Sequence, residues 1–354
     1  MWVPLMPPQT RWIGGVRALY WPSVGVPRGA LLFVPGNPGV CEYYAEFLSH
    51  LHALLRGRCV IVCKGSPGHD ETRHAPPPTG RYAWLGHAWT YYGLPDQVAS
   101  QQLAFEELRA ELPAGAPLVL AGHSMGAYVA TQLLCKYADD VQGMQLLFPT
   151  ISHIAKAPQA RFTRLWMAPP LLFVVHWLVV CLACLPAHWH YMLVRALTMQ
   201  PPAYARMTSE FLRRPGAVLT ALRTYADEEA LITDIPDELR QVLQRRKIPV
   251  RAYWGRGDSV RMHYLCRIHG RHRGTGYTRR RSWGCNRGPC LRTCTAVSAR
   301  TSLRRTSRPF LRQSVRWACR TPFACVRDVR LTRPGDSVAV ARICAHWLEQ
   351  DFGW

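Results

Sequence analysis

A glycine-flanked serine between an apolar run and an amphipathic stretch is the feature that most constrains the fold of this chain. The pentapeptide GHSMG, residues 122–126, follows the apolar run 118–121 and precedes a helical pattern over 125–137. A strand that turns sharply into a helix needs small residues two positions either side of the central one. The turn exposes the serine above the N–H groups of the helix. We therefore interpret Ser124 as a nucleophile; the alternative is an ordinary strand–helix turn.

Apolar runs and amphipathic stretches alternate along the rest of the chain. The expected strands are 30–34, 59–63, 118–121, 141–148 and 248–254, and the expected helices are 42–55, 94–112, 125–137 and 337–350. Strands that alternate with helices predict a mostly parallel sheet with helices on both faces. Together with the serine motif, this pattern predicts the α/β-hydrolase fold, with an apolar cap insertion.

A nucleophilic serine needs oxyanion donors, a base and an orienting acid. The backbone N–H of Met125 is the first expected donor, and the loop after strand 30–34, near Asn37, is expected to supply the second. In this fold the acid follows a late strand, and Asp258 comes after the strand 248–254. The alternative for Asp258 is a turn aspartate that follows a glycine. The mechanism requires neither a metal nor an organic cofactor.

Several segments together resemble the lipid droplet-associated hydrolase family. They are residues 33–39, 43–44, 47–48, 68–69, 96–98, 122–128, 147–151 and 257–258. The loop PGNPG at 35–39 combined with GHSMGAY at 122–128 is the specific part, and the resemblance covers roughly 16–258 and 336–352. It implies a serine esterase that acts on lipid esters, at lipid droplets and the endoplasmic reticulum.

The histidine of the predicted triad has no clear counterpart in this sequence. The family places it in a Pro-His-Ala-Phe stretch before the closing helix, and no such stretch occurs here. His263, His269 and His272 are weak candidates, whereas His346 is expected on the face of the closing helix. The activity of this chain is therefore open. The alternative function is a catalytically inactive protein of the lipid-droplet or membrane surface that keeps the hydrolase fold.

The net charge of +22 is concentrated in residues 259–334, which hold 19 arginines, no lysine and one acidic residue. The remainder of the chain carries only +4, which argues against a nucleic-acid partner. Three interpretations compete: a basic nucleic-acid arm, a metal cluster around Cys285, Cys290 and Cys294, or translation out of frame. The spacings of five and four between these cysteines do not fit a zinc site.

The out-of-frame interpretation is compatible with the genetic code. Residues 319–323 read Cys-Arg-Thr-Pro-Phe, and their codons shifted by one base can encode Pro, His, Ala and Phe. The lack of lysine, the loss of periodicity and the return of a helical pattern at 337 favour the same interpretation. Residues without such a period cannot form a packed core, so we expect this segment to be poorly ordered.

An apolar segment, 165–197, lies where α/β-hydrolases carry a cap. Its residues 171–185 include no charge and one histidine. A membrane-spanning helix needs about 20 residues, so this run fits an interfacial element better. Trp166, Trp177, Trp189 and Tyr191 are suited to a lipid boundary. The alternatives are therefore a lipid-anchoring segment and a buried cap helix that covers the active site.

These observations divide the chain into a core in two parts, a cap and one anomalous segment. The core comprises 16–150 together with 241–258 and 336–354, the cap insertion is 151–240, and the arginine-rich segment is 259–335. Thirteen irregularly spaced cysteines and no visible signal peptide indicate a reducing compartment with free thiols. The expected location is the lipid droplet, and the endoplasmic reticulum membrane or its cytoplasmic face.

Overall fold

The computed structural model describes residues 5–156, 160–253, 294–295 and 334–354. Its main sheet contains the strands β1 (Gln9–Ile13), β2 (Val16–Trp21), β3 (Ala30–Val34), β4 (Val60–Lys64), β7 (Leu118–His123), β8 (Val141–Leu147), β9 (Val250–Tyr253) and β10 (Cys294–Thr295). Their spatial order is β1-β2-β4-β3-β7-β8-β9-β10. Neighbours from β4 to β9 are parallel, whereas the pairs β1–β2, β2–β4 and β9–β10 are antiparallel.

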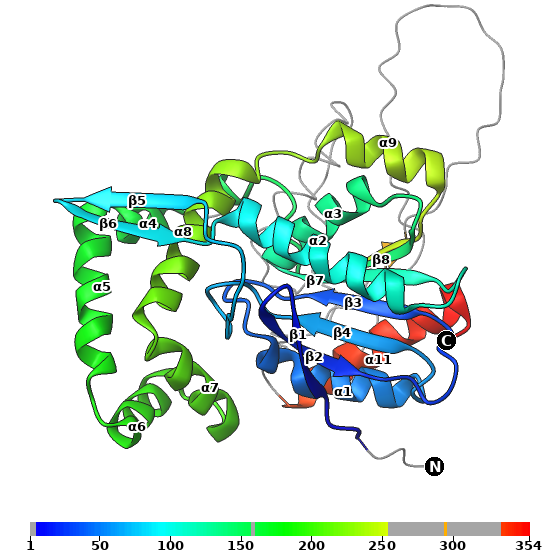
Figure 1. Ribbon diagram of the computed structural model, residues 1–354, viewed down its shortest axis with the longest axis horizontal. Helices are drawn as coiled ribbons and strands as arrows, with labels where there is room; N and C mark the ends of the chain where they lie inside the picture. Colours follow the sequence, from blue (N-terminus) through cyan, green and yellow to red (C-terminus); the bar gives the residue numbers. More distant parts are fainter. Residues whose placement is uncertain (1–4, 157–159, 254–293, 296–333) are drawn as a thin grey trace, which may run out of the picture.

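Helices cover both faces of this sheet (Figure 1). One face carries α2 (Leu94–Glu111), α3 (Met125–Lys136) and α9 (Asp237–Arg246), and the other carries α1 (Ala45–Leu54) and α11 (Pro334–Phe352). Leu32 of β3 packs with the first group and Leu31 with the second, because successive strand side chains point to opposite faces. All of β3 is buried, as in strands covered on both sides. The predicted α/β-hydrolase fold is confirmed.

The central elements lie where the sequence predicts them, whereas an N-terminal hairpin was not predicted. β3 has the expected bounds, and β9 is shorter than the expected strand 248–254. The hairpin β1–β2 turns through Gly14 and Gly15, with φ of 53° and 76°. A Gly-Gly pair between two alternating runs is a hairpin signal, because a two-residue turn favours positive φ. β10 is a two-residue strand inside the segment for which no sustained strand was expected.

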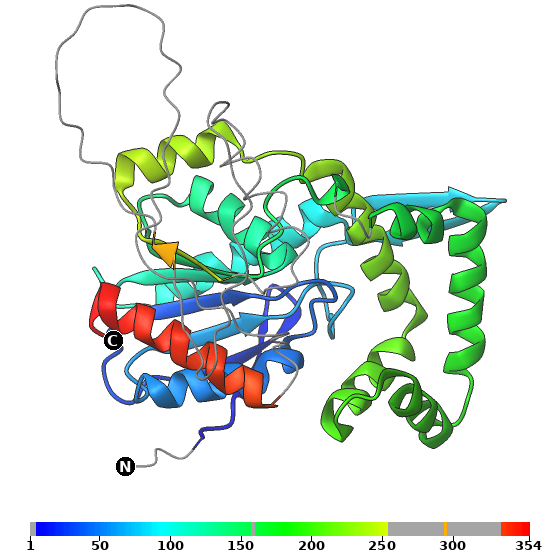
Figure 2. The same ribbon diagram turned by 180° about the vertical axis from the view of Figure 1, so that it is seen from behind.

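Five helices and a second hairpin extend beyond the carboxyl ends of the central strands (Figures 1 and 2). They are α4 (Ala160–Met167), α5 (Pro169–Ala183), α6 (Ala187–Thr198), α7 (Pro202–Leu212), α8 (Pro215–Leu231), β5 (Gly80–Trp84) and β6 (His87–Tyr91). Of the residues of α5, only Leu172 is buried, and Trp177 is 45% exposed. The alternative of a buried cap helix is therefore wrong for α5. None of the helices that the structure describes combines the length and the apolar character that a membrane-spanning helix requires.

The hairpin β5–β6 packs against α5 through aromatic side chains. The ring of Phe173 on α5 lies 5.1 Å from that of Trp84 and 6.5 Å from that of Trp89. The hairpin turns through Leu85 and Gly86, with φ of 47° and 77°. The hairpin was not predicted from the sequence, because its strands are neither apolar runs nor strongly alternating. The hairpin and α5 thus form one projecting unit.

Candidate active site

Ser124 occupies a strained turn between β7 and α3. Its φ of 52° and ψ of −120° lie in a region that residues with a side chain rarely adopt. Its N–H donates to the carbonyl of Leu147 at 3.0 Å, and its own carbonyl accepts from Ala127 at 3.0 Å. Contacts with β8 and with the first turn of α3 therefore hold the backbone of Ser124 in this conformation.

The two glycines of the motif are required by close backbone contacts. A Cβ on Gly122 would lie 2.4 Å from the carbonyl oxygen of Gly126. A Cβ on Gly126 would lie 2.2 Å from the carbonyl oxygen of Val34. The prediction that both positions must lack bulk is confirmed.

The hydroxyl of Ser124 is not engaged by the helix that follows it. Ser124 precedes α3, but its side chain does not cap the helix. Among the described residues nothing forms a hydrogen bond with this hydroxyl, and the side chain is partly exposed. The first N–H groups of a helix have no partner inside it, so the backbone N–H of Met125 is available for an anion beside Ser124.

The loop after β3 packs directly against the strand–helix turn at residues 122–126, which we call the elbow. A Cβ on Gly36 would lie 3.1 Å from Cβ of Ser124. The side-chain amide of Asn37, however, donates to the carbonyl of Ala221 at 2.9 Å and to Oε1 of Glu228 at 3.0 Å. The side chain is thus engaged by α8, which leaves the backbone N–H of Asn37 as the candidate for the second oxyanion donor.

Tyr44 joins this loop to the elbow. It ends the short 3-10 helix Cys41–Tyr44, and its hydroxyl accepts from the N–H of Gly36 at 2.9 Å. The same hydroxyl lies 2.9 Å from Nδ1 of His123. Burial lowers the pKa of His123 to about 4, so its imidazole is neutral at pH 7. His123 therefore has a structural role in the elbow. The contacts of Tyr44 with Gly36 and His123 were not predicted from the sequence.

A family model described as lipid-droplet associated hydrolase matches residues 27–265. The chain belongs to the lipid droplet-associated hydrolase family. It is 30% identical over 258 residues to the Gallus gallus lipid droplet-associated hydrolase, covering 67% of this chain and 72% of that protein. It is 29% identical over 147 residues to the Mus musculus lipid droplet-associated hydrolase, covering 40% of this chain and 43% of that protein.

The matches to the mouse, rat and human relatives span less than half of the length of those proteins. Among solved structures, a putative lipase from Acinetobacter baumannii AYE has a TM-score of 0.43 at 16% identity, covering 75% of this chain and 81% of that one. Membership of the lipid droplet-associated hydrolase family agrees with the resemblance found in the sequence.

In this member of the lipid droplet-associated hydrolase family, the ends of three parallel strands meet beside Ser124. His123 of β7 pairs in register with Leu147 of β8, and Leu147 pairs with Tyr253 of β9. The strand that precedes Asp258 therefore ends at the same sheet edge as Ser124. Asp258 itself lies outside the described residues, as do the candidate bases His263, His269 and His272. His346 is exposed on α11, as expected of a helix-face residue.

Residues 68–69 also belong to the family resemblance, and His69 contacts the PGNPG loop. His69 is buried, and its Nδ1 accepts from the N–H of Gly39 at 3.0 Å. Burial lowers the pKa of His69 to about 4. This histidine therefore supports the far end of the PGNPG loop and is not exposed to a substrate.

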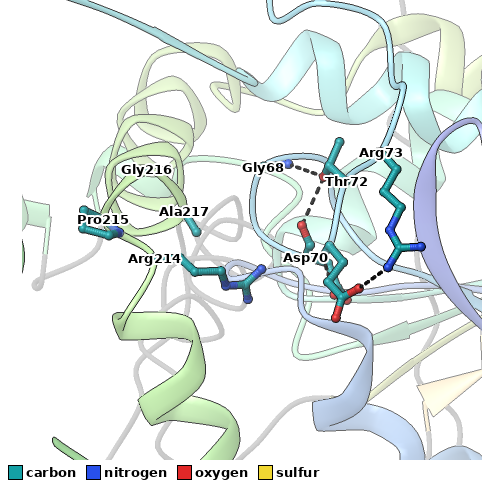
Figure 3. A pocket seen from close by; sticks show the side chains of 9 residues that line it. Gly68, Asp70, Thr72, Arg73, Arg214, Pro215, Gly216 and Ala217 are labelled. Carbon is teal, nitrogen blue, oxygen red and sulfur yellow. Dashed lines mark hydrogen bonds and ion pairs between the residues drawn. The ribbon is translucent and has the colours of Figure 1, made fainter. Parts of the chain in front are cut away.

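A cavity of about 430 Å³ lies between residues 68–73 and the start of α8 (Figure 3). Arg73 pairs with Glu71 at 3.7 Å, and the side chain of Arg214 points toward Asp70. Ser124 is not among the residues that line this cavity. The cavity is therefore separate from the elbow.

Proposed function

We propose that the chain is a serine esterase that cleaves ester bonds of lipids at the surface of lipid droplets. The observation that carries the proposal is the strained backbone of Ser124 with its hydroxyl free. Ser124 Oγ attacks the acyl carbonyl, a histidine accepts its proton, and Asp258 orients that histidine. The backbone N–H groups of Met125 and Asn37 stabilise the negative charge that develops on the carbonyl oxygen.

The reaction then proceeds through an acyl-enzyme. The histidine returns its proton to the alcohol oxygen as the ester C–O bond breaks, and the acyl group stays on Ser124. Water, deprotonated by the same histidine, attacks the acyl group and releases the fatty acid. The neutral His123 and the hydroxyl of Tyr44 keep the elbow in contact with the loop after β3 during these steps.

The exposed apolar side chains of α5 and α6 support a lipid surface as the partner. Val174, Trp177 and Leu178 on α5 are 58%, 45% and 56% exposed, and Trp189 on α6 is 67% exposed. Residues 165–199 contain no acidic residue and one arginine, so anionic headgroups meet no repulsion there. Exposed apolar side chains in such number are typical of membrane and protein contacts. We place the protein on lipid droplets and on the cytoplasmic face of the endoplasmic reticulum, with 151–240 as its cap.

A second candidate is an inactive lipid-surface protein that keeps the hydrolase fold. The same exposed helices favour it, because lipid binding needs no triad, and this chain has no Pro-His-Ala-Phe stretch. Labelling with a fluorophosphonate probe separates the two candidates, since an activated serine reacts quickly. In the chain that carries the shifted-frame segment in place of residues 259–334, we expect Ser124→Ala to lower labelling and esterase activity by roughly a thousandfold or more, with the fold unchanged by circular dichroism. Equal labelling of both proteins would contradict the proposed nucleophile, and droplet binding without labelling would favour the second candidate.

A further inference from the structure

The side chain of Asn37 ties the loop beside Ser124 to one helix of the cap. Its amide nitrogen has two hydrogens, and both are used: one by the carbonyl of Ala221 and one by Oε1 of Glu228. Both acceptors belong to α8. Because Asn37 directly follows Gly36, which abuts Ser124, a displacement of α8 changes the position of this loop.

Glu228 is an unusual acceptor for such a bond. Its side chain is 2% exposed, and no basic side chain among the described residues pairs with it. Burial raises its pKa to about 8; the bond from Asn37 opposes this rise, and the charges of Asp227 and Glu229 add to it. At pH 7 the carboxyl group is therefore largely neutral.

The charged side chains near Glu228 interact with partners other than Glu228. Asp227 accepts from the N–H of Leu94 at 3.0 Å, and Glu229 pairs with Arg164 of α4 at 3.3 Å. Arg223 lies over the rings of Tyr82 and Tyr91 in the hairpin. His69, whose Nε2 is 3.5 Å from the hydroxyl of Thr224, is neutral. Glu228 is thus the acidic group of α8 that faces the loop at Asn37.

We infer that Glu228 is a positioning residue that holds the Asn37 backbone beside Ser124 and so ties the oxyanion site to the cap helix α8. The inference rests on the proposed serine hydrolase. From the core side, the hydroxyl of Tyr44 holds the N–H of Gly36. Glu228 provides the matching restraint from the cap side. An ionised carboxylate here would also oppose the negative charge of the oxyanion, because the group is buried.

The test compares Glu228→Ala, Glu228→Gln and the control Glu210→Gln in the full chain whose residues 259–334 are replaced by the shifted-frame segment, and this parent protein serves as the wild type. Glu210 is an exposed carboxylate of the same cap. Hydrolysis of p-nitrophenyl butyrate is measured from pH 6 to 9.5. We expect Glu228→Ala to lower kcat roughly tenfold with KM within about twofold, a smaller loss than the removal of an oxyanion donor. Glu228→Gln keeps an acceptor for Asn37, so its kcat should match the wild type at pH 7.

The pH profile separates positioning from a merely structural role. Wild-type kcat should fall above pH 8 as Glu228 ionises, whereas Glu228→Gln should keep its rate there. If Glu228→Ala behaves like Glu210→Gln, or if Glu228→Gln loses the same activity as Glu228→Ala at pH 7, the inference is wrong. Should Glu228→Ala fail to fold, the pH profile of Glu228→Gln decides. Ser124→Ala is run in parallel: wild-type hydrolysis that does not depend on Ser124 would overturn the proposed function itself, and the positioning role with it.

Discussion

The elbow and the cap are both rich in apolar residues, but their surroundings differ completely. Residues 118–121 of β7 are at most 2% exposed, because strands flank them and helices cover both faces. In α5, an equally apolar helix, only Leu172 is buried. Apolar sequence alone therefore does not predict burial; a partner surface within the chain is also needed. Where that partner is missing, exposed apolar area points to a partner outside the chain.

The largest expected effect concerns the base that the elbow needs. We predict that replacing residues 259–334 by the segment encoded in the shifted frame raises esterase activity by several orders of magnitude, because it restores a histidine near position 321. A missing triad member typically costs about that much. The two proteins are compared at equal folded concentration. Equal rates would mean that His263, His269 or His272 is the base and that the out-of-frame interpretation is wrong.

A matched pair of glycines probes the difference in packing. Gly126→Ala places a methyl group 2.2 Å from the carbonyl oxygen of Val34, which is backbone and cannot rotate away. A Cβ on Gly216 in α8 meets nothing within 4 Å. We expect Gly126→Ala to destabilise the fold by roughly 4 kcal/mol, in the range of severe core changes. Gly216→Ala should stabilise it by about 0.5 kcal/mol, because alanine restricts the unfolded chain.

Urea unfolding measures both glycine variants. A similar loss of stability in the two would show that the elbow is not more tightly packed than the cap. A stable Gly126→Ala protein would require the backbone at Val34 to move, and with it the loop beside Ser124.

Glu228 lies where these two regions meet, and its pKa predicts how stability changes with pH. The folded-state pKa of about 8 is above the ordinary value of 4.5, so the folded protein binds this proton more tightly. Its stabilising effect is fully present below pH 4.5 and is lost as the pH rises toward and through 8. Relative to the wild type, Glu228→Gln should gain on the order of 4 kcal/mol in the free energy of unfolding between pH 5 and pH 9.

The control for this pH effect is Glu210→Gln, which removes an exposed carboxylate of the same cap. Other titrating groups are common to both proteins and cancel in the comparison. A constant difference between Glu228→Gln and the wild type would mean that Glu228 ionises normally in the folded protein.

The sequence predicted the elements that short apolar runs and turns define by themselves. β3 was predicted at its observed bounds, and Ser124 was placed at the turn after β7, because a glycine-flanked serine between a strand and a helix is a local pattern. The contacts of Tyr44 and Glu228 were missed, because each depends on elements far apart in the chain. Tyr44 meets His123 across 79 positions, and Glu228 meets Asn37 across 191.

The exposure of α5 also could not be decided from the sequence. An uncharged run of fifteen residues fits a buried helix and a lipid-facing helix equally well, since both are apolar all round. What decides between them is whether other elements cover the helix, and the hairpin β5–β6 covers only the side that carries Phe173. No local sequence pattern indicates which elements cover the helix.

The smallest expected effect concerns the exposed tryptophans of α5 and α6. Trp177 and Trp189 are 45% and 67% exposed, so replacing both by serine should leave the free energy of unfolding nearly unchanged. Each loses roughly 1 kcal/mol of apolar contact with a lipid phase, which predicts roughly a tenfold or greater loss of droplet binding for the pair. Flotation with triolein droplets coated with phosphatidylcholine measures the bound fraction. Val26→Ser, 83% exposed on the loop before β3, is the control and should bind like the wild type. If deletion of residues 171–185 also leaves droplet binding unchanged, the lipid contact lies outside α5, and its exposed apolar surface faces some other partner.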